Sequence, residues 1–566
     1  MVQVRKFGLI CILLLFISFP LFAVSYLELN LNHTINTNPF ARRGSALEVF
    51  RVIEKAKVDA GVQGIILNIG NINHNREYMW ELRNSLEQFK ESGKRIVAYI
   101  NNADIDVYML ASVADKIVMD ELGILTMLGY SAGRGYVSQT LEKFGIGVME
   151  LRYFEYKSAA ESYTRTNMSA ADRRQYSDYL DDIFNHTRST LMEARGWTTQ
   201  EFDLFINQYF MHSTTSAVVH NLVDYAGGFS VVKDAIFEIE NSHETSFFLY
   251  GDTNSSLTKS IFNYTAPNAG GLFKRPPIIA VVYADGQTDM TRGMEIAKLT
   301  KIISDLTNNG RVKAIVVRIN SPGGSAQAAD ALAEAIRNAR YRKPVVVSMG
   351  QMAASGGYWA SMTASHVMAT PYTITGSIGV IGSWFYDNGL YNKLGVNIDV
   401  LKRGDHSDLM TGFLIPYRRM TALEEDQYKK YILDLYGLFI NKVSAGRNMK
   451  IQEVEKVAQG RIFSGTRALE EGLIDSVGSL SDALGIARSL AGITEDTPVN
   501  YREYPEPKLM DILFGRFPTI AKLFGSRAAR PAPDFLEMLL PDAGLSYRLE
   551  NNGQIMPILP LEFSVW

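Results

Sequence analysis

Apolar residues along the chain alternate between two spacings. Residues 46–60 carry them at helical intervals and lead into the β-branched run GIILNI, and residues 295–309 and the run AIVVRI repeat this order. Helices that alternate with short, near-continuous Val and Ile runs are typical of parallel sheets covered by helices on both faces. The pattern therefore predicts an α/β protein.

The chain also contains an internal repeat. The segment GVQGIILNI at 61–69 resembles RVKAIVVRI at 311–319, and KFGIGVMELR at 143–152 resembles KLGVNIDVLK at 393–402. The offset is 250 residues in these pairs and 251 where AVVHNLVD at 217–224 matches ALEEGLID. Because chance does not keep one offset over so many segments, we expect a tandem duplication of one α/β domain.

Length agrees with a duplication, since one hydrophobic core stops growing near ~250–300 residues and the chain has 566. A polar stretch that ends in Gly and Pro separates the two copies and is typical of a linker. The expected division is an N-terminal anchor at 1–25, a first domain at 40–237, a linker at 238–276, a second domain at 277–495 and a C-terminal extension at 496–566.

The N-terminus has the pattern of a membrane anchor. Arg5 and Lys6 precede an uncharged apolar run at 7–24, which as a helix spans roughly 27 Å, enough to cross a bilayer core. The basic end stays in the cytoplasm, so the rest of the chain is expected on the exported side. A cleaved signal peptide is the competing interpretation, because Ala23 and Ser25 are small.

Composition excludes several other classes of function. The net charge is −3, so no strong basic field is available to bind nucleic acid. The single cysteine, Cys11, rules out a disulfide within the chain, and no pair among the 8 histidines has the HExxH spacing of a zinc site. We therefore expect neither a metal nor a cofactor.

Two glycine-bearing turns in the second copy carry candidate chemistry. The strand AIVVRI leads into NSPGG, where Gly323 and Gly324 permit a tight turn whose amides can face an oxyanion. The next strand leads into MAASGG, where Ser355 stands before two glycines and its small neighbours allow a substrate to approach. Because open α/β folds place their sites at the carboxyl ends of strands, the two turns together predict a nucleophilic serine.

Comparison of the copies indicates that they share one site. At an offset of 250, Ser355 corresponds to Ile105, and Lys157 corresponds to Ser407. A serine nucleophile needs a base, and neither His366 nor His406 stands in a sequence context that suggests this pairing. A buried lysine can serve, because desolvation lowers its pKa by up to ~3–5 and leaves it neutral.

These segments resemble the long, duplicated form of bacterial signal peptide peptidase A, also called protease IV. The resemblance covers residues 45–490 and depends on EYKSAAES, RINSPGGS, VVVSMGQMAASGGYWAS, TGSIGVIG and VAQGRIFSGTRALEEGLIDSVG. It implies a ClpP/crotonase-like fold in each half, a Ser/Lys dyad, an N-terminal membrane anchor and a bowl-shaped homotetramer. The chain departs from the family pattern at Ser162, where a proline is usual, and in the tail from residue 500 onward.

The resemblance also implies roles for individual residues. Ser355 is then the nucleophile and Lys157 the general base, the amides of Gly324 and Gly356 form the oxyanion hole, and an extended peptide binds along strand edges near residues 376–378. The peptide-binding residues are accordingly Gly376, Ser377 and Ile378. The expected substrates are cleaved signal peptides and other apolar peptides, and the expected location is the inner membrane, with the catalytic part on the periplasmic side.

Two other functions remain open at this point. Crotonase-like folds also serve acyl-CoA hydratases and isomerases, which use acidic residues and a CoA site. A membrane-tethered scaffold that has kept the fold without activity is the non-enzymatic alternative. Whether Lys157 reaches Ser355 of its own chain or of a neighbour is not determined by the sequence.

Overall fold

The computed structural model describes residues 25–31, 45–70, 75–241, 248–250, 276–506 and 564–565. The expected anchor at 7–24 lies outside these residues, as do most of the linker and of the C-terminal extension. Within the described ranges, no helix combines the length and the apolar character that crossing a bilayer requires.

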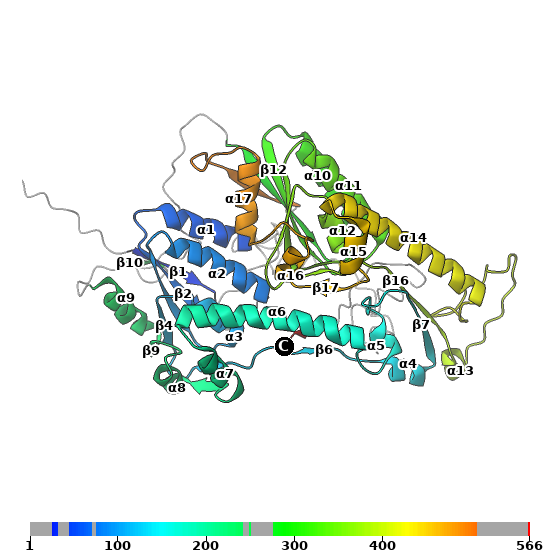
Figure 1. The fold of residues 1–566 in the computed structure, drawn as a ribbon, viewed down its shortest axis with the longest axis horizontal. Coiled ribbons are helices and arrows are strands. Elements are labelled where there is room, and N and C mark those ends of the chain that lie inside the picture. The colour runs from blue at the N-terminus through cyan, green and yellow to red at the C-terminus, as the bar shows by residue number, and fades with distance from the viewer. Residues whose placement is uncertain are drawn as a thin grey trace, which may run out of the picture.

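The first half alternates strands and helices as expected (Figure 1). Its elements are β1 Ser25–Asn30, α1 Ala46–Val58, β2 Gly64–Ile69, α2 Arg76–Lys90, β3 Arg95–Ile100, α3 Ile105–Ala111, β4 Lys116–Met119, β5 Ile124–Thr126, β6 Ala132–Gly133, α4 Ser138–Phe144, β7 Ile146–Arg152, α5 Glu161–Thr164, α6 Ala170–Arg195, α7 Thr199–Asn207, β8 Met211–Ser213, α8 Thr214–Val219, β9 Tyr225–Ala226, α9 Val232–Glu240 and β10 Phe248–Tyr250.

The second half repeats this order. Its elements are β11 Ile278–Asp285, α10 Ile296–Asn308, β12 Val312–Ser321, α11 Ala326–Arg340, β13 Val345–Ala354, α12 Gly356–Ser361, β14 His366–Ala369, β15 Ile374–Gly376, β16 Ile381–Asp387, α13 Leu390–Leu394, α14 Ala422–Arg447, α15 Ile451–Val457, β17 Ile462–Phe463, α16 Gly465–Glu470, β18 Ser476–Val477, α17 Leu480–Leu490 and β19 Asn500–Tyr504, with β20 Ser564–Val565 near the C-terminus.

The boundaries of these elements confirm the duplication. Helices α1 and α10 begin and end 250 residues apart, and so do α2 and α11 and the short strands β5 and β15. The long helices α6 and α14 both have 26 residues and are displaced by 252. Residues in the two halves can therefore be compared position by position.

Each half has its own sheet. The first has the strand order β10-β1-β2-β3-β4-β9, and all of its neighbouring strands are parallel. The second runs β17-β15-β13-β12-β11-β19, with β14 beside β13 and β18 beside β14. Both sheets extend past the expected domain bounds, because β1 precedes residue 40 and β19 follows residue 495. Strand β1 pairs with β2, and β19 pairs with β11.

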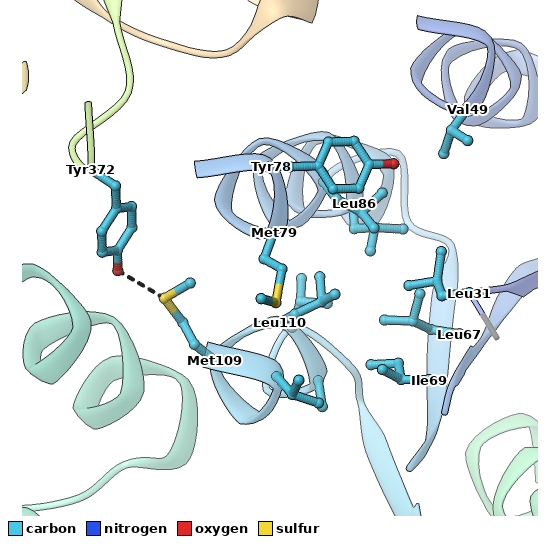
Figure 2. Packing of buried hydrophobic residues seen from close by; sticks show 14 of the residues in the cluster. Leu31, Val49, Leu67, Ile69, Tyr78, Met79, Leu86, Met109, Leu110 and Tyr372 are labelled. Carbon is cyan, nitrogen blue, oxygen red and sulfur yellow. Dashed lines mark hydrogen bonds between the residues drawn. The ribbon is translucent and has the colours of Figure 1, made fainter. Parts of the chain in front are cut away.

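The halves are joined into one body by shared structure. Strand β7 of the first half pairs antiparallel with β16 of the second over seven residue pairs. Helix α6 runs along both halves in Figure 1 and contacts β17. Figure 2 shows the core of the first half, in which Tyr372 of the second half donates a hydrogen bond to the Met109 sulfur at 3.0 Å.

A buried charge cluster also crosses this boundary. Arg318 on β12 donates to Glu81 on α2 at 2.8 and 2.9 Å and also contacts Glu77. Burial raises the pKa of Glu77 to about 7, and the Arg318 guanidinium opposes that rise. Because removing one partner would leave the other charge buried and unpaired, the cluster ties the two halves together in one register.

Candidate active site

Ser355 stands at the turn between β13 and α12. Its backbone has φ 56° and ψ −113°, a conformation that is strained for a residue with a side chain. Two hydrogen bonds hold the turn: the Ser355 amide donates to the Gly376 carbonyl at 2.9 Å, and the Trp359 amide donates to the Ser355 carbonyl at 2.8 Å. Because these hydrogen bonds fix the backbone of Ser355, they also fix the direction in which its side chain leaves the turn.

The two residues after Ser355 have to be glycines, because neighbouring atoms leave no room for a Cβ. A Cβ on Gly356 would lie 2.7 Å from Thr288 Oγ1, and one on Gly357 would lie 2.8 Å from the Ser321 carbonyl oxygen. The amides at the start of α12 have no acceptor inside the helix, so they remain available to a ligand.

The turn after β12 brings a second amide to the same place. Gly323 and Gly324 have φ of 105° and 147°, and a Cβ on Gly356 would lie only 3.3 Å from the Gly324 nitrogen. Thr288 holds this turn, because its amide donates to the Gly323 carbonyl and its carbonyl accepts from the Ser325 amide, both at 2.8 Å. Nothing in the sequence points to Thr288, which lies in an unremarkable polar loop far from both glycine turns.

Lys157 reaches Ser355 of the same chain. Its Nζ lies 2.7 Å from Ser355 Oγ, and the exposed fractions of the two residues are 1% and 0%. Burial lowers the pKa of Lys157 well below its usual value. A neutral amine within hydrogen-bonding distance of a serine hydroxyl has the geometry and the protonation state of a general base.

Ser377 completes the surroundings of the amine. Lys157 Nζ donates to the Ser377 carbonyl at 2.8 Å and to Ser377 Oγ at 2.9 Å. A neutral amine has two N–H donors and one lone pair. In the neutral form, an amine that directs both donors to Ser377 would point its lone pair at Ser355 Oγ, 2.7 Å away.

The turn that carries Lys157 is held from both halves. A Cβ on Gly460 would lie 2.6 Å from Lys157 Cβ, so only glycine permits this approach. Gln175 of α6 donates to the Tyr156 carbonyl at 3.1 Å and accepts from the Ile462 amide at 3.2 Å. It therefore links the lysine turn to β17, and nothing in its sequence context had indicated this role.

Some backbone groups of the expected peptide-binding residues 376–378 form hydrogen bonds within the chain. The Gly376 carbonyl accepts from Ser355, the Ser377 amide donates to the Arg461 carbonyl at 2.6 Å, and the Ile378 carbonyl accepts from Gly460 at 2.8 Å. Strand β15 lies between β13 and β17, which cover its two sides. Strand β17 pairs with Thr375 and Gly376, and binding of a peptide along residues 376–378 stays a prediction.

The remaining candidates lie elsewhere. His366 Nε2 contacts Ser476 Oγ at 2.8 Å and His406 Nδ1 contacts Glu424 at 2.8 Å. The counterparts of the dyad carry no such chemistry: Ile105 is a buried residue of α3, and Ser407 donates to the Gly404 carbonyl. The first-half counterpart of the SPGG turn, residues 71–74, lies outside the described residues.

Comparison with known proteins gives a family match. The model of peptidase family S49 matches the chain twice, at residues 88–243 and at residues 337–494. The two matches fall on the two halves of the duplication, and together they cover more than half of the chain.

Similar proteins extend over most of the chain. Protease 4 of Salmonella typhi is 30% identical over 88% of this chain and 79% of its own length. Protease 4 of Haemophilus influenzae is 29% identical, with 82% and 76% covered, and the chloroplastic serine protease SPPA of Arabidopsis thaliana is 28% identical, with 87% and 73% covered. Among solved structures, a mutant of ClpP1 from Listeria monocytogenes covers 36% of this chain and 94% of its own at 15% identity, with a TM-score of 0.25 that supports no inference.

Proposed function

The chain belongs to peptidase family S49 and is a serine peptidase, and from this premise we propose that it cleaves peptides with a Ser355/Lys157 dyad while bound to a membrane. The observation that carries the proposal is the 2.7 Å separation between Lys157 Nζ and Ser355 Oγ, enclosed where burial lowers the pKa of the amine. It is supported by the Gly324 and Gly356 amides, which converge beside the serine.

In the first step, the Lys157 lone pair takes the hydroxyl proton of Ser355 as Oγ attacks the peptide carbonyl carbon. The carbonyl oxygen becomes negatively charged and accepts hydrogen bonds from the Gly324 and Gly356 amides. The Lys157 ammonium is held by the Ser377 carbonyl and hydroxyl oxygens. It then returns its proton to the leaving amine, and the peptide carbonyl carbon stays bonded to Oγ as an ester.

In the second step, water hydrolyses this ester. Lys157, neutral again, takes a proton from the water as it attacks the ester carbonyl. The same two amides hold the new oxyanion, and the proton returns to Ser355 Oγ as the acid product leaves. One lysine thus serves both halves of the reaction, which requires that it lose and regain a proton without moving.

The substrates that we propose are cleaved signal peptides and other apolar peptides. The proposed location is the inner membrane, through residues 7–24, with the catalytic body on the periplasmic side and four chains assembled together. The apolar run after Arg5 and Lys6 supports the anchor, and the family resemblance supports the substrate class and the tetramer.

The test compares Ser355→Ala and Lys157→Met with the wild-type chain in detergent. Each variant should lower kcat on an apolar reporter peptide by at least about 10³-fold and should lose labelling by a serine-reactive phosphonate. Lys429→Met, which removes an exposed lysine of α14, is the matched control and should keep both. Activity retained in a folded Lys157→Met variant would exclude the dyad, and recovery of the full-length chain in the soluble fraction would exclude the membrane location.

A further inference from the structure

Thr288 packs against both of the glycines whose amides are proposed to form the oxyanion hole. It stands in the connection between β11 and α10, and its exposed fraction is 0%. A Cβ on Gly324 would lie 2.8 Å from Thr288 Oγ1, and a Cβ on Gly356 would lie 2.7 Å from the same atom. One side-chain atom therefore occupies the space that both missing Cβ atoms would need, although the two glycines belong to different turns.

The backbone of Thr288 fixes the direction of the Gly324 amide. Thr288 and Gly324 form a parallel β-bridge, in which Thr288 bonds to the residues on either side of Gly324, namely Gly323 and Ser325. In such a bridge the N–H and C=O of the residue between the two bonded neighbours are directed to the opposite side. The Gly324 amide is thus directed away from Thr288 while its neighbours hold the turn in place.

The segment that carries Thr288 is braced from its other side. The Gln287 carbonyl accepts a hydrogen bond from the Met294 amide, and the Asp289 carbonyl accepts one from the Ile296 amide, both at 3.0 Å. Ile296 is the first residue of α10 and is fully buried. Because both neighbours of Thr288 are held in this way, its side chain is a rigid support for the groups that pack against it.

The side chain of Thr288 contributes through its shape more than through its hydrogen bond. Its hydroxyl donates to the Ser325 carbonyl at 3.4 Å, which is long for a hydrogen bond between two oxygens, usually about 2.7–2.8 Å. By contrast, no Cβ fits between Oγ1 and either glycine. A methyl group in place of the hydroxyl would fill the same space, and a β-branched side chain has restricted rotation about χ1. Removing the branch would leave a gap beside both glycines, which would lose their contacts on that side.

We infer that Thr288 is a positioning residue of the oxyanion hole, and that its β-branched side chain is the spacer that sets the separation between the Gly324 and Gly356 amides. The inference rests on the proposed function, because it assigns these two amides to the developing oxyanion. Without the spacer the amides no longer converge on one oxygen atom. The tetrahedral intermediate then loses hydrogen bonding on which the bound substrate does not depend, so the loss falls on kcat and not on KM. Thr288 acts through the two glycines and not on the substrate.

The experiment compares Thr288→Ala with Thr288→Val in the full chain, on an apolar reporter peptide, with each rate divided by the amount of Ser355 that a phosphonate titrates. Thr288→Ala removes the spacer and should lower kcat by about 10- to 100-fold with KM within about twofold, a smaller loss than removing an oxyanion donor outright. Thr288→Val keeps the β-branched shape and loses only a weak hydrogen bond, so its kcat should stay within about threefold of the wild-type value. Thr291→Ala is the matched control and should keep the wild-type kcat, because Thr291 is an exposed threonine of the same connection whose hydroxyl also makes a 3.4 Å hydrogen bond, to Asp289.

A transition-state analogue separates positioning from stability. Ser355 Oγ adds to the boron of a peptide boronic acid, the hydroxyl proton passes to Lys157, and one boron-bound oxygen takes the place of the oxyanion. The Ki of this inhibitor should rise in Thr288→Ala by the factor by which kcat/KM falls. Thr187→Ala, at a buried threonine of α6, should lower Tm and change neither quantity.

The outcomes distinguish the spacer from the proposed function. An inactive wild-type chain would refute the proposed function. An active wild type with unchanged kcat/KM and Ki in Thr288→Ala, or with equal losses in Thr288→Ala and Thr288→Val, would refute the spacer alone. If Thr288→Ala does not fold, Thr288→Ser takes its place, because it keeps the hydroxyl oxygen but lets it rotate away, and its kcat should fall below that of Thr288→Val.

Discussion

Replacing Ser377 by alanine tests how the amine of Lys157 is oriented. The variant removes one of two acceptors, the hydroxyl oxygen 2.9 Å from Nζ, and keeps the carbonyl at 2.8 Å. Losing one hydrogen bond costs about 1–1.5 kcal/mol, so kcat/KM should fall about tenfold, mostly through kcat. The serine and the lysine both remain, so the loss should stay far below that of Lys157→Met.

The same substitution should move the pH profile in a defined direction. A hydrogen bond to a charged group is worth about 1.5–3 kcal/mol and one to a neutral group about 1, so the ammonium loses more than the amine. The pKa of Lys157 should therefore fall by about 0.5 to 1.5, since one pKa step is about 1.36 kcal/mol. The ascending limb of kcat/KM should shift to lower pH although the maximum rate is reduced.

The assay follows kcat and KM on a fluorogenic apolar peptide across the pH range, together with Tm. Ser361→Ala is the matched control, because Ser361 is a fully buried serine on α12 whose hydroxyl donates to the Gly357 carbonyl and makes no contact with Lys157. It should change Tm without moving the limb. If the limb of Ser377→Ala moved to higher pH, or kcat/KM stayed at the wild-type value, the proposed orientation of the amine would be wrong.

Two further predictions concern the lysine. Burial lowers the pKa of Lys157, and only the neutral amine accepts a proton. Wild-type kcat/KM should therefore rise with pH and reach half its maximum well below pH 10.5, the usual pKa of a lysine. A midpoint near pH 10.5 would contradict a buried base. Gln175→Met keeps the side-chain volume but removes the hydrogen bonds to Tyr156 and Ile462, so kcat should fall about tenfold while KM stays within twofold. The control is Gln208→Met, at an exposed glutamine. An equal loss of kcat in the control would show that Gln175 does not position the lysine turn.

The sequence was sufficient for the features that depend on local pattern. The duplication, the alternation of helices with buried strands and the two glycine turns all leave periodic or compositional marks. The pairing of Lys157 with Ser355 could be expected from family resemblance, whereas its physical reason, burial between Gly460 and Ser377, depends on contacts between segments hundreds of residues apart.

The features that the sequence does not show have the same origin. Residues 376–378 look like an open strand in sequence, whereas the later strand β17 pairs with Thr375 and Gly376. The expected domain bounds leave out β1 and β19, although β1 has the place beside β2 that β11 has beside β12, and β19 lies beside β11 as β10 lies beside β1. Thr288 and Gln175 each act through two hydrogen bonds to backbone groups, and such roles have no pattern that a single sequence can display.

The division of the dyad between the halves has a consequence for the life of the chain before it is complete. Lys157 is synthesised early, Ser355 follows 198 residues later, and the glycine that encloses the lysine comes at 460. An emerging or truncated polypeptide therefore carries a base without a nucleophile, or a nucleophile beside a solvated, protonated lysine. Under the proposed mechanism, hydrolysis requires that the last strands dock, so an unfinished copy would not cleave its neighbours.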